Sequence, residues 1–299
     1  MRKILLNIIL LTSHFVVSQN TEITLNAIWQ FHKKGAESWF PAKVPGNVHY
    51  DLLQNKQIPD PFLSDNEKKV KWIENEDWEY KTSFKCDKKI LSQQNIELKF
   101  EGLDTYAKVY LNEKLILESD NMFRSWTVNV KDFIKESENS LLIVFESAVK
   151  KGKAEAAKLP YTLPGDEKVF TRKAQYQYGW DWAPRLVTCG IWKPIKLITW
   201  NKLKIESIHA ITKSISDTIA EVDFVIETNC DTDDYYDIRY TYSSRNSDQA
   251  KLISKLVHLK PGITTTTVSS PIRDPRLWWC NGMADRKPNL YTAGFKITK

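Results

Sequence analysis

The sequence predicts an all-β protein that consists of two β-sandwich domains. Three observations carry this prediction. Apolar and polar residues alternate with a period of two in stretches such as "IELKFEG" (96–102) and "AKVYLNEK" (107–114), as they do in half-buried strands. Turn signals such as "EGLD" and "LNEK" separate these stretches. The chain also contains 11 tryptophans in 299 residues, a bias that is typical of aromatic-rich β-proteins and of carbohydrate binders.

Further elements follow from local patterns. The continuous apolar run "NSLLIVFES" (139–147) predicts a central strand that is buried on both faces, and "KPIKLITW" (193–200) alternates again. Asn47 stands where it can cap a helical turn over 48–53. The stretch "SAVKKGKAEAAKLP" (147–160) is rich in alanine and lysine and stops at a proline, so it predicts either a short helix or a mobile loop.

The composition changes near Asn201, where we place the boundary between the two domains. Tryptophans are frequent before this point and absent from 202 to 275. Strand-like stretches such as "EVDFVIET" (221–228) continue beyond it, and about seven short strands are typical of an immunoglobulin-like sandwich. We therefore predict a first domain over 22–200 and a second domain over 201–299.

Residues 1–18 have the pattern of a signal peptide. Arg2 and Lys3 precede a mostly apolar stretch that ends at Val17, and Ser18 suits the small-residue rule for cleavage. The stretch is too short and too interrupted for a membrane span, and no later segment has the required length. The expected location is therefore outside the cytoplasm, periplasmic or secreted, without a membrane partner.

Charge and cysteine usage exclude several function classes. The formal net charge is +6, but no basic block stands out, which argues against nucleic-acid binding. The four cysteines, Cys86, Cys189, Cys230 and Cys280, form no C-x-x-C pair, and the histidines do not cluster near them, so we expect no zinc or other metal site. No motif indicates a cofactor. Four cysteines allow three disulfide pairings; we expect buried free thiols instead.

The most unusual stretch is "AQYQYGWDW" (174–182). In an extended chain its side chains would alternate between two faces. The aromatic face would carry Tyr176, Tyr178, Trp180 and Trp182, and the polar face would carry Gln175, Gln177, Gly179 and Asp181.

Three interpretations of this pattern are open. The stretch is an ordinary half-buried strand, which the alternation by itself favours. Alternatively, the anchored rings hold the polar face as a rigid platform for a hydroxyl-rich ligand, which Gly179 allows to approach the backbone. In the third interpretation the tryptophans are exposed and stack on sugar rings, and we rank it lowest because it leaves a large apolar patch.

With these residues identified, the chain resembles the N-terminal part of the β-mannosidases of glycoside hydrolase family 2. The stretches that carry the resemblance span nearly the whole chain after the signal peptide: "VPGNVHYDLL", "IPDPF", "FEGLDTYAKVYLN", "NMFRSW", "TRKAQYQYGWDWAPRLVTCGIWKPI" and "DPRLWWCNG". The resemblance implies a galactose-binding-like jelly roll over 22–200 and an immunoglobulin-like sandwich over 201–299. In the family a TIM barrel follows and carries two catalytic carboxylates. This sequence ends at Lys299 without matching positions for them, and Cys280 stands where we expect proline, so we name no catalytic residue.

The resemblance also implies roles for residues of the aromatic stretch. Asp181 would accept hydrogen bonds from mannose hydroxyls, and Trp180 and Trp182 would orient it or wall the pocket. Arg172 and Arg185 would bind ligand oxygens or pair with acids, and we favour ion pairing for both.

The implied function is that of the N-terminal portion of an exported β-mannosidase that acts on non-reducing-end β-mannosyl residues. Its partners would be β-mannoside glycans and a catalytic barrel, and we expect no activity from this chain alone. The alternatives are a stand-alone, non-catalytic carbohydrate-binding module and a docking subunit for a separately encoded barrel.

Overall fold

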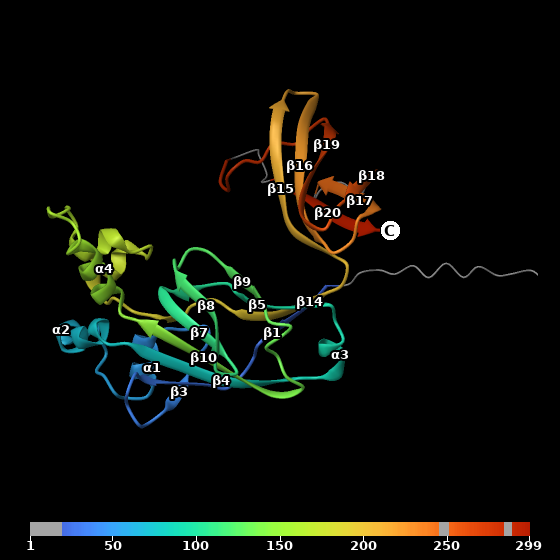
Figure 1. The fold of residues 1–299 in the computed structure, drawn as a ribbon. Helices are drawn as coiled ribbons and strands as arrows, with labels where there is room; N and C mark the ends of the chain where they lie inside the picture. The colour runs from blue at the N-terminus through green and yellow to red at the C-terminus, as the bar shows by residue number, and fades with distance from the viewer. Residues whose placement is uncertain (1–19, 245–250, 284–288) are drawn as a thin grey trace, which may run out of the picture. The chain divides into compact units, whose positions relative to one another are not determined.

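The computed structural model describes residues 20–244, 251–283 and 289–299 (Figure 1). The chain divides into two compact units, which we call the first domain (Thr21–Thr199) and the second domain (Trp200–Lys299). The predicted signal peptide, residues 1–18, lies outside the described residues. None of the helices in the described ranges is long and apolar enough to cross a membrane.

The first domain is a sandwich of two sheets, as predicted. The smaller sheet has the strand order β1 (Thr21–Thr24), β14 (Ile195–Trp200), β5 (Asn95–Phe100) and β9 (Trp126–Asn129). The larger sheet has the order β3 (Phe40–Ala42), β2 (Trp29–Lys33), β4 (Trp78–Cys86), β10 (Ser137–Glu146), β7 (Tyr106–Leu111) and β8 (Lys114–Asp120). Because β10 pairs with both β4 and β7, it is the central strand that its apolar run predicted.

The core between these sheets explains the alternating sequence pattern. Ile96, Leu98 and Phe100 of β5 are fully buried, and so are Val109 and Leu111 of β7. Burying one side chain of this size contributes about 1.5–3 kcal/mol, so the apolar face of each strand specifies its orientation in the sandwich.

Helices occupy the connections between strands. Asn47 caps α1 (Val48–Gln54) as predicted, since its side-chain oxygen accepts a hydrogen bond from the Tyr50 amide at 3.0 Å. The alanine- and lysine-rich stretch forms α4 (Ala148–Ala156), so of the two alternatives the helix is correct, and Ser147 caps it. The other helical segments are α2 (Asn66–Val70), η1 (Lys71–Asn75), α3 (Lys88–Leu91), η2 (Asp166–Phe170) and η3 (Gln175–Gln177).

The second domain is also a two-sheet sandwich. One sheet has the order β15 (Leu203–Ile215), β16 (Ile219–Cys230) and β19 (Gly262–Arg273), and the other has β18 (Lys251–Leu259), β17 (Asp234–Ser244) and β20 (Tyr291–Thr298). The described residues thus form six strands where the sequence predicted about seven. Phe224, Tyr240 and Phe295 meet in the core, with Phe224 and Phe295 in an edge-to-face contact at 5.2 Å.

The four cysteines are free thiols. Cys86 and Cys230 are buried and Cys189 is half-buried, as expected for thiols that pack as small apolar side chains. The expectation was wrong for Cys280, which is exposed because it follows the last strand of its sheet in an irregular segment.

Candidate functional site

The aromatic stretch 174–182 forms a turn and a hairpin instead of one extended strand. After η3, the chain forms β11 (Tyr178–Trp180), reverses at Asp181 and Trp182, and returns as β12 (Ala183–Arg185). Tyr178 pairs with Arg185, and Trp180 pairs with Ala183. The predicted alternation across 174–182 is therefore wrong, because a 3-10 turn and a tight reversal replace the extended backbone that it assumed.

The predicted aromatic anchor face is also wrong. Tyr178 alone among the four rings is buried, whereas Tyr176, Trp180 and Trp182 are 50%, 55% and 69% exposed. The buried Tyr178 hydroxyl lies 2.9 Å from the Thr171 hydroxyl, and burial raises the pKa of Tyr178 to about 12. Tyr178 alone thus anchors the hairpin. The exposure of Trp180 and Trp182 agrees with the interpretation that we ranked lowest, in which the tryptophans are exposed.

The predicted polar platform does not form either. The Gln175 amide donates to the carbonyl oxygens of Lys168 and Lys173 at 3.1 and 3.2 Å, so it serves the local backbone. The Gln177 amide donates to the buried Asp104 carboxylate at 3.2 Å, so it faces the interior. Gly179 has a φ of +95°, so glycine is required there by the backbone itself.

Asp181 is the polar residue that remains available at the tip of the hairpin. Its side chain is exposed, and among the described residues nothing donates a hydrogen bond or forms an ion pair with its carboxylate. The exposed rings of Trp180 and Trp182 flank it in sequence. The rings of Trp182 and Tyr176 lie 5.9 Å apart at a tilt of 37°, and the Lys168 ammonium lies 6.0 Å from the Trp180 ring. The hairpin tip therefore carries both a free hydrogen-bond acceptor and exposed aromatic rings, the two kinds of group that a hydroxyl-rich ring binds.

Arg185 clamps the returning strand to the rest of the first domain. Its Nε lies 2.9 Å from one Glu74 oxygen, and its Nη2 contacts the other at 3.1 Å. The same Nη2 lies 2.7 Å from Glu167. The ion pairing favoured for Arg185 is therefore observed. Its partners are 111 and 18 residues away, so no local pattern could have identified them.

Arg172 also forms an ion pair, with Asp120 at 3.0 Å, and both side chains are mostly exposed. The ion pairing favoured for this residue is therefore observed, and its contact with a sugar stays a prediction. Among residues 20–244, 251–283 and 289–299, no group of three or more His, Cys, Asp or Glu side chains could hold a metal ion.

Comparisons with known proteins identify the family. The model of the glycosyl hydrolase 2 galactose-binding domain-like family matches residues 29–193, and the model of glycosyl hydrolases family 2 matches residues 203–299. This chain belongs to glycosyl hydrolase family 2. The two matches coincide with the jelly-roll-type sandwich and the immunoglobulin-like sandwich of the structure.

Individual members of family 2 are similar over most of the chain. β-Mannosidase B of Thermothelomyces thermophilus is 34% identical over 272 residues, which cover 86% of this chain and 30% of that protein. β-Mannosidase B of Emericella nidulans is 32% identical, with 93% of this chain and 34% of that protein covered. The crystal structure of the β-D-mannosidase from Dictyoglomus thermophilum is 36% identical, with a TM-score of 0.87, and covers 93% of this chain and 34% of its own. The chain thus spans about a third of the length of these relatives.

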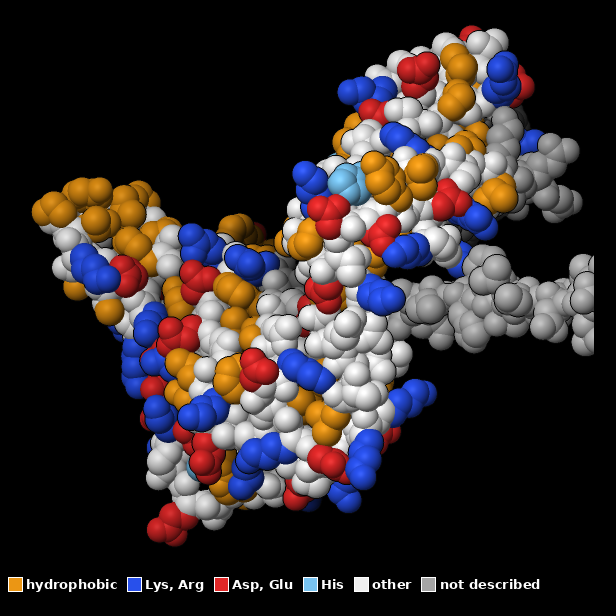
Figure 2. Space-filling model, turned by 45° about the vertical axis from the view of Figure 1, so that its right-hand side comes forward, with side chains coloured by type: hydrophobic (Ala, Val, Ile, Leu, Met, Phe, Trp, Pro, Cys, Tyr) orange, Lys and Arg blue, Asp and Glu red, His pale blue; other side chains and the backbone are white. Residues whose placement is uncertain are grey.

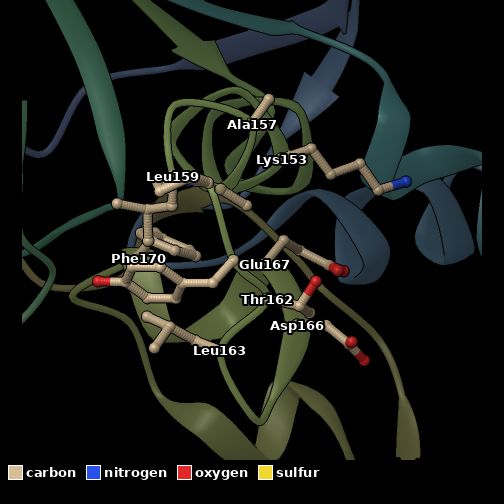
Figure 3. Close-up of a pocket in the computed structure, with 11 residues that line it drawn as sticks. Lys153, Ala157, Leu159, Thr162, Leu163, Asp166, Glu167 and Phe170 are labelled. Atoms are coloured by element: carbon tan, nitrogen blue, oxygen red, sulfur yellow. The ribbon is translucent and has the colours of Figure 1, made fainter.

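A cavity of about 470 Å³ is formed by the end of α4 and the segment that follows it, up to Phe170 (Figure 3). Leu159, Leu163 and Phe170 line one side, and Asp166 and Glu167 line the other. Glu167 is also the residue that accepts a hydrogen bond from Arg185 of the hairpin. Hydrophobic side chains also gather on the surface of the projecting lobe that contains α4 (Figure 2).

Proposed function

We propose that this chain supplies the sugar-contacting part of a β-mannosidase. In this proposal Asp181 accepts hydrogen bonds from the hydroxyl groups of a β-linked mannose at the non-reducing end of a glycan. The observation that carries it is the exposed Asp181 carboxylate at the tip of the hairpin, which has no partner among the described residues and whose sequence neighbours, Trp180 and Trp182, both have exposed indole rings. The relatives named β-mannosidases support mannose as the sugar.

The proposed role of Asp181 is binding, and Trp180 and Trp182 form walls around the sugar. Hydrolysis by the retaining mechanism needs two carboxyl groups about 5–5.5 Å apart across the scissile bond. We place that pair in a catalytic barrel that completes the pocket, as the family resemblance implies. We also propose that residues 1–18 direct the protein to the periplasm or the exterior of the cell.

The test is a titration of the chain, labelled with 5-fluorotryptophan, with methyl β-mannoside. ¹⁹F NMR follows Trp180 and Trp182, whose signals are identified by single substitution to Phe. An open surface that offers part of a pocket predicts a dissociation constant on the order of 10 mM. Asp181→Asn keeps the shape of the side chain and removes its charge, so it should weaken binding by about tenfold, or ~1.4 kcal/mol.

The matched control is Asp217→Asn, at an exposed position in the turn between β15 and β16 of the second domain, which should titrate like the wild type. Methyl β-glucoside, which differs in the orientation of one hydroxyl, should bind more weakly than the mannoside. Unmoved Trp180 and Trp182 signals, or equal titrations of Asp181→Asn and wild type, would contradict the proposal. A micromolar dissociation constant for the chain alone would favour the stand-alone carbohydrate-binding module instead.

A further inference from the structure

We propose that the buried Lys173–Asp104 ion pair is a positioning device that holds both stems of the 178–185 hairpin and thereby orients Asp181. Lys173 and Asp104 play no part in the sugar contact itself. The statement about Asp181 rests on the proposed function, whereas the statement about the hairpin stands on contacts alone.

The ion pair is fully enclosed. The Lys173 side chain is 0% exposed and the Asp104 side chain 4% exposed, and the Lys173 ammonium lies 2.5 Å from the Asp104 Oδ1 atom. The same ammonium donates to the carbonyl oxygen of Thr188 at 2.6 Å. Lys173 precedes the hairpin and Thr188 follows it, so one side chain ties the incoming stem to the outgoing stem.

Gln177 closes these contacts into a ring. Its amide nitrogen donates to the Asp104 Oδ2 atom at 3.2 Å, and its side-chain oxygen accepts from the Thr188 amide at 3.3 Å. Its own carbonyl oxygen accepts from the Leu186 amide at 2.9 Å. Asp104, Lys173, Thr188 and Gln177 therefore form a closed cycle of hydrogen bonds at the base of the hairpin.

The cycle is attached to the sandwich through Asp104. This residue belongs to β6 (Leu103–Asp104), which pairs with β13 (Gly190–Ile191), the strand that begins two residues after Thr188. The Asp104 Oδ1 atom also accepts a hydrogen bond from the Thr105 hydroxyl at 2.5 Å, and with Gln177 on Oδ2 both carboxylate oxygens are occupied. Every charged and polar side chain of this cycle thus has a hydrogen-bond partner in the observed geometry of the hairpin base.

The chemistry favours a positioning role over a role in overall stability. Desolvation of two buried charges offsets most of their attraction, so replacing such a pair by apolar residues is often neutral for folding. Charge-assisted hydrogen bonds are directional, however, and a buried network of them permits few geometries. Removing both charges should therefore loosen the hairpin more than the sandwich.

The test compares the wild type with a double variant that carries both Lys173→Met and Asp104→Leu. This variant loses both charges of the pair, so neither is left unpaired in the interior. Hydrogen exchange of the peptide that covers 178–186 should rise by about tenfold, while exchange in β4 and β10 stays within about twofold. The ¹⁹F signals of Trp180 and Trp182 should broaden or shift in the absence of sugar. The control is Lys108→Met, at a surface lysine that bridges Glu118 and Glu146, and it should change neither readout.

Three outcomes would overturn the proposal. Unchanged hairpin exchange in the folded double variant would show that the pair does not hold the hairpin, and an equal rise across the sandwich would show a general stabilising role. Methyl β-mannoside binding equal to that of the wild type, despite a mobile hairpin, would show that Asp181 needs no positioning. Because exchange is measured without sugar, a chain that binds no mannoside refutes the proposed function and leaves the hairpin result intact.

Discussion

Replacing Arg185, which pairs with Glu74 and Glu167, should destabilise the first domain far more than replacing Arg172. The two arginines are only 13 residues apart in the sequence. Arg185→Met deletes three contacts to Glu74 and one to Glu167, whose side chains are 5% and 11% exposed. Breaking a buried ion pair costs about 3–5 kcal/mol because the remaining charge is stranded. Since the Arg185 side chain is 30% exposed and water can enter, we expect about 3 kcal/mol.

Arg172→Met is the matched comparison. Arg172 and its partner Asp120 are 67% and 54% exposed, and such surface pairs contribute about 0–1 kcal/mol. In a domain of this size, 3 kcal/mol corresponds to a decrease of roughly 6–12 °C in Tm. Thermal and urea unfolding of both variants, with tryptophan fluorescence and calorimetry as readouts, would measure the difference.

The effect of Arg185→Met should depend on pH. Burial alone would raise the pKa of Glu167, but the hydrogen bond and the charge of Arg185 outweigh burial, and the pKa lies below its usual value. A carboxylate with a lowered pKa contributes its stabilisation above the pKa of the unfolded chain and loses it as the pH falls. The gap between wild type and variant should therefore shrink below about pH 4. Equal effects of the two arginine substitutions, or a gap that is constant down to pH 3, would refute this reasoning.

Three further predictions concern α1 and the activity. Burial and, secondly, the charge of Lys173 lower the pKa of His49 to about 4. Between pH 6.5 and 4 the imidazole of His49 therefore takes up a proton in the unfolded chain but not in the folded one. The free energy of unfolding should then drop by about 3 kcal/mol between pH 6.5 and 4. Urea unfolding at several pH values would measure this pH dependence, and His49→Gln should reduce it. The same pH dependence in the variant and the wild type would contradict the assignment to His49. Asn47→Ala should lower the stability by about 1 kcal/mol through loss of the α1 cap, measured by urea unfolding, and a neutral effect would contradict the cap assignment. The purified chain alone should not hydrolyse an aryl β-mannoside, and turnover that a β-mannosidase inhibitor abolishes would show otherwise.

Strand positions and caps were predictable because the forces that set them act over a few residues. The period-two pattern of β5 and β7 reflects burial of every second side chain, and the continuous apolar run of β10 reflects burial on both faces. The cap of α1 follows from the side-chain oxygen of Asn47, which satisfies an amide three residues later.

The hairpin was not predictable from the same pattern. The alternation in "AQYQYGWDW" is equally compatible with an extended strand and with a turn followed by a hairpin, because sequence periodicity reports side-chain spacing and not the direction of the backbone. Gly179 was the local sign of a departure from extended structure, and its positive φ shows why.

The sequence by itself determined that this chain is an all-β protein that resembles family 2, and Asp181 as a sugar contact is a prediction that comes from this resemblance. The tertiary structure alone decided that Asp181 lies on a hairpin tip, and which groups hold that hairpin. Asp104 and Lys173 are 69 residues apart, and Glu74 and Arg185 are 111 apart. Buried charges need partners, but folding selects those partners from the whole chain, so their identity appears only when the sandwich is assembled.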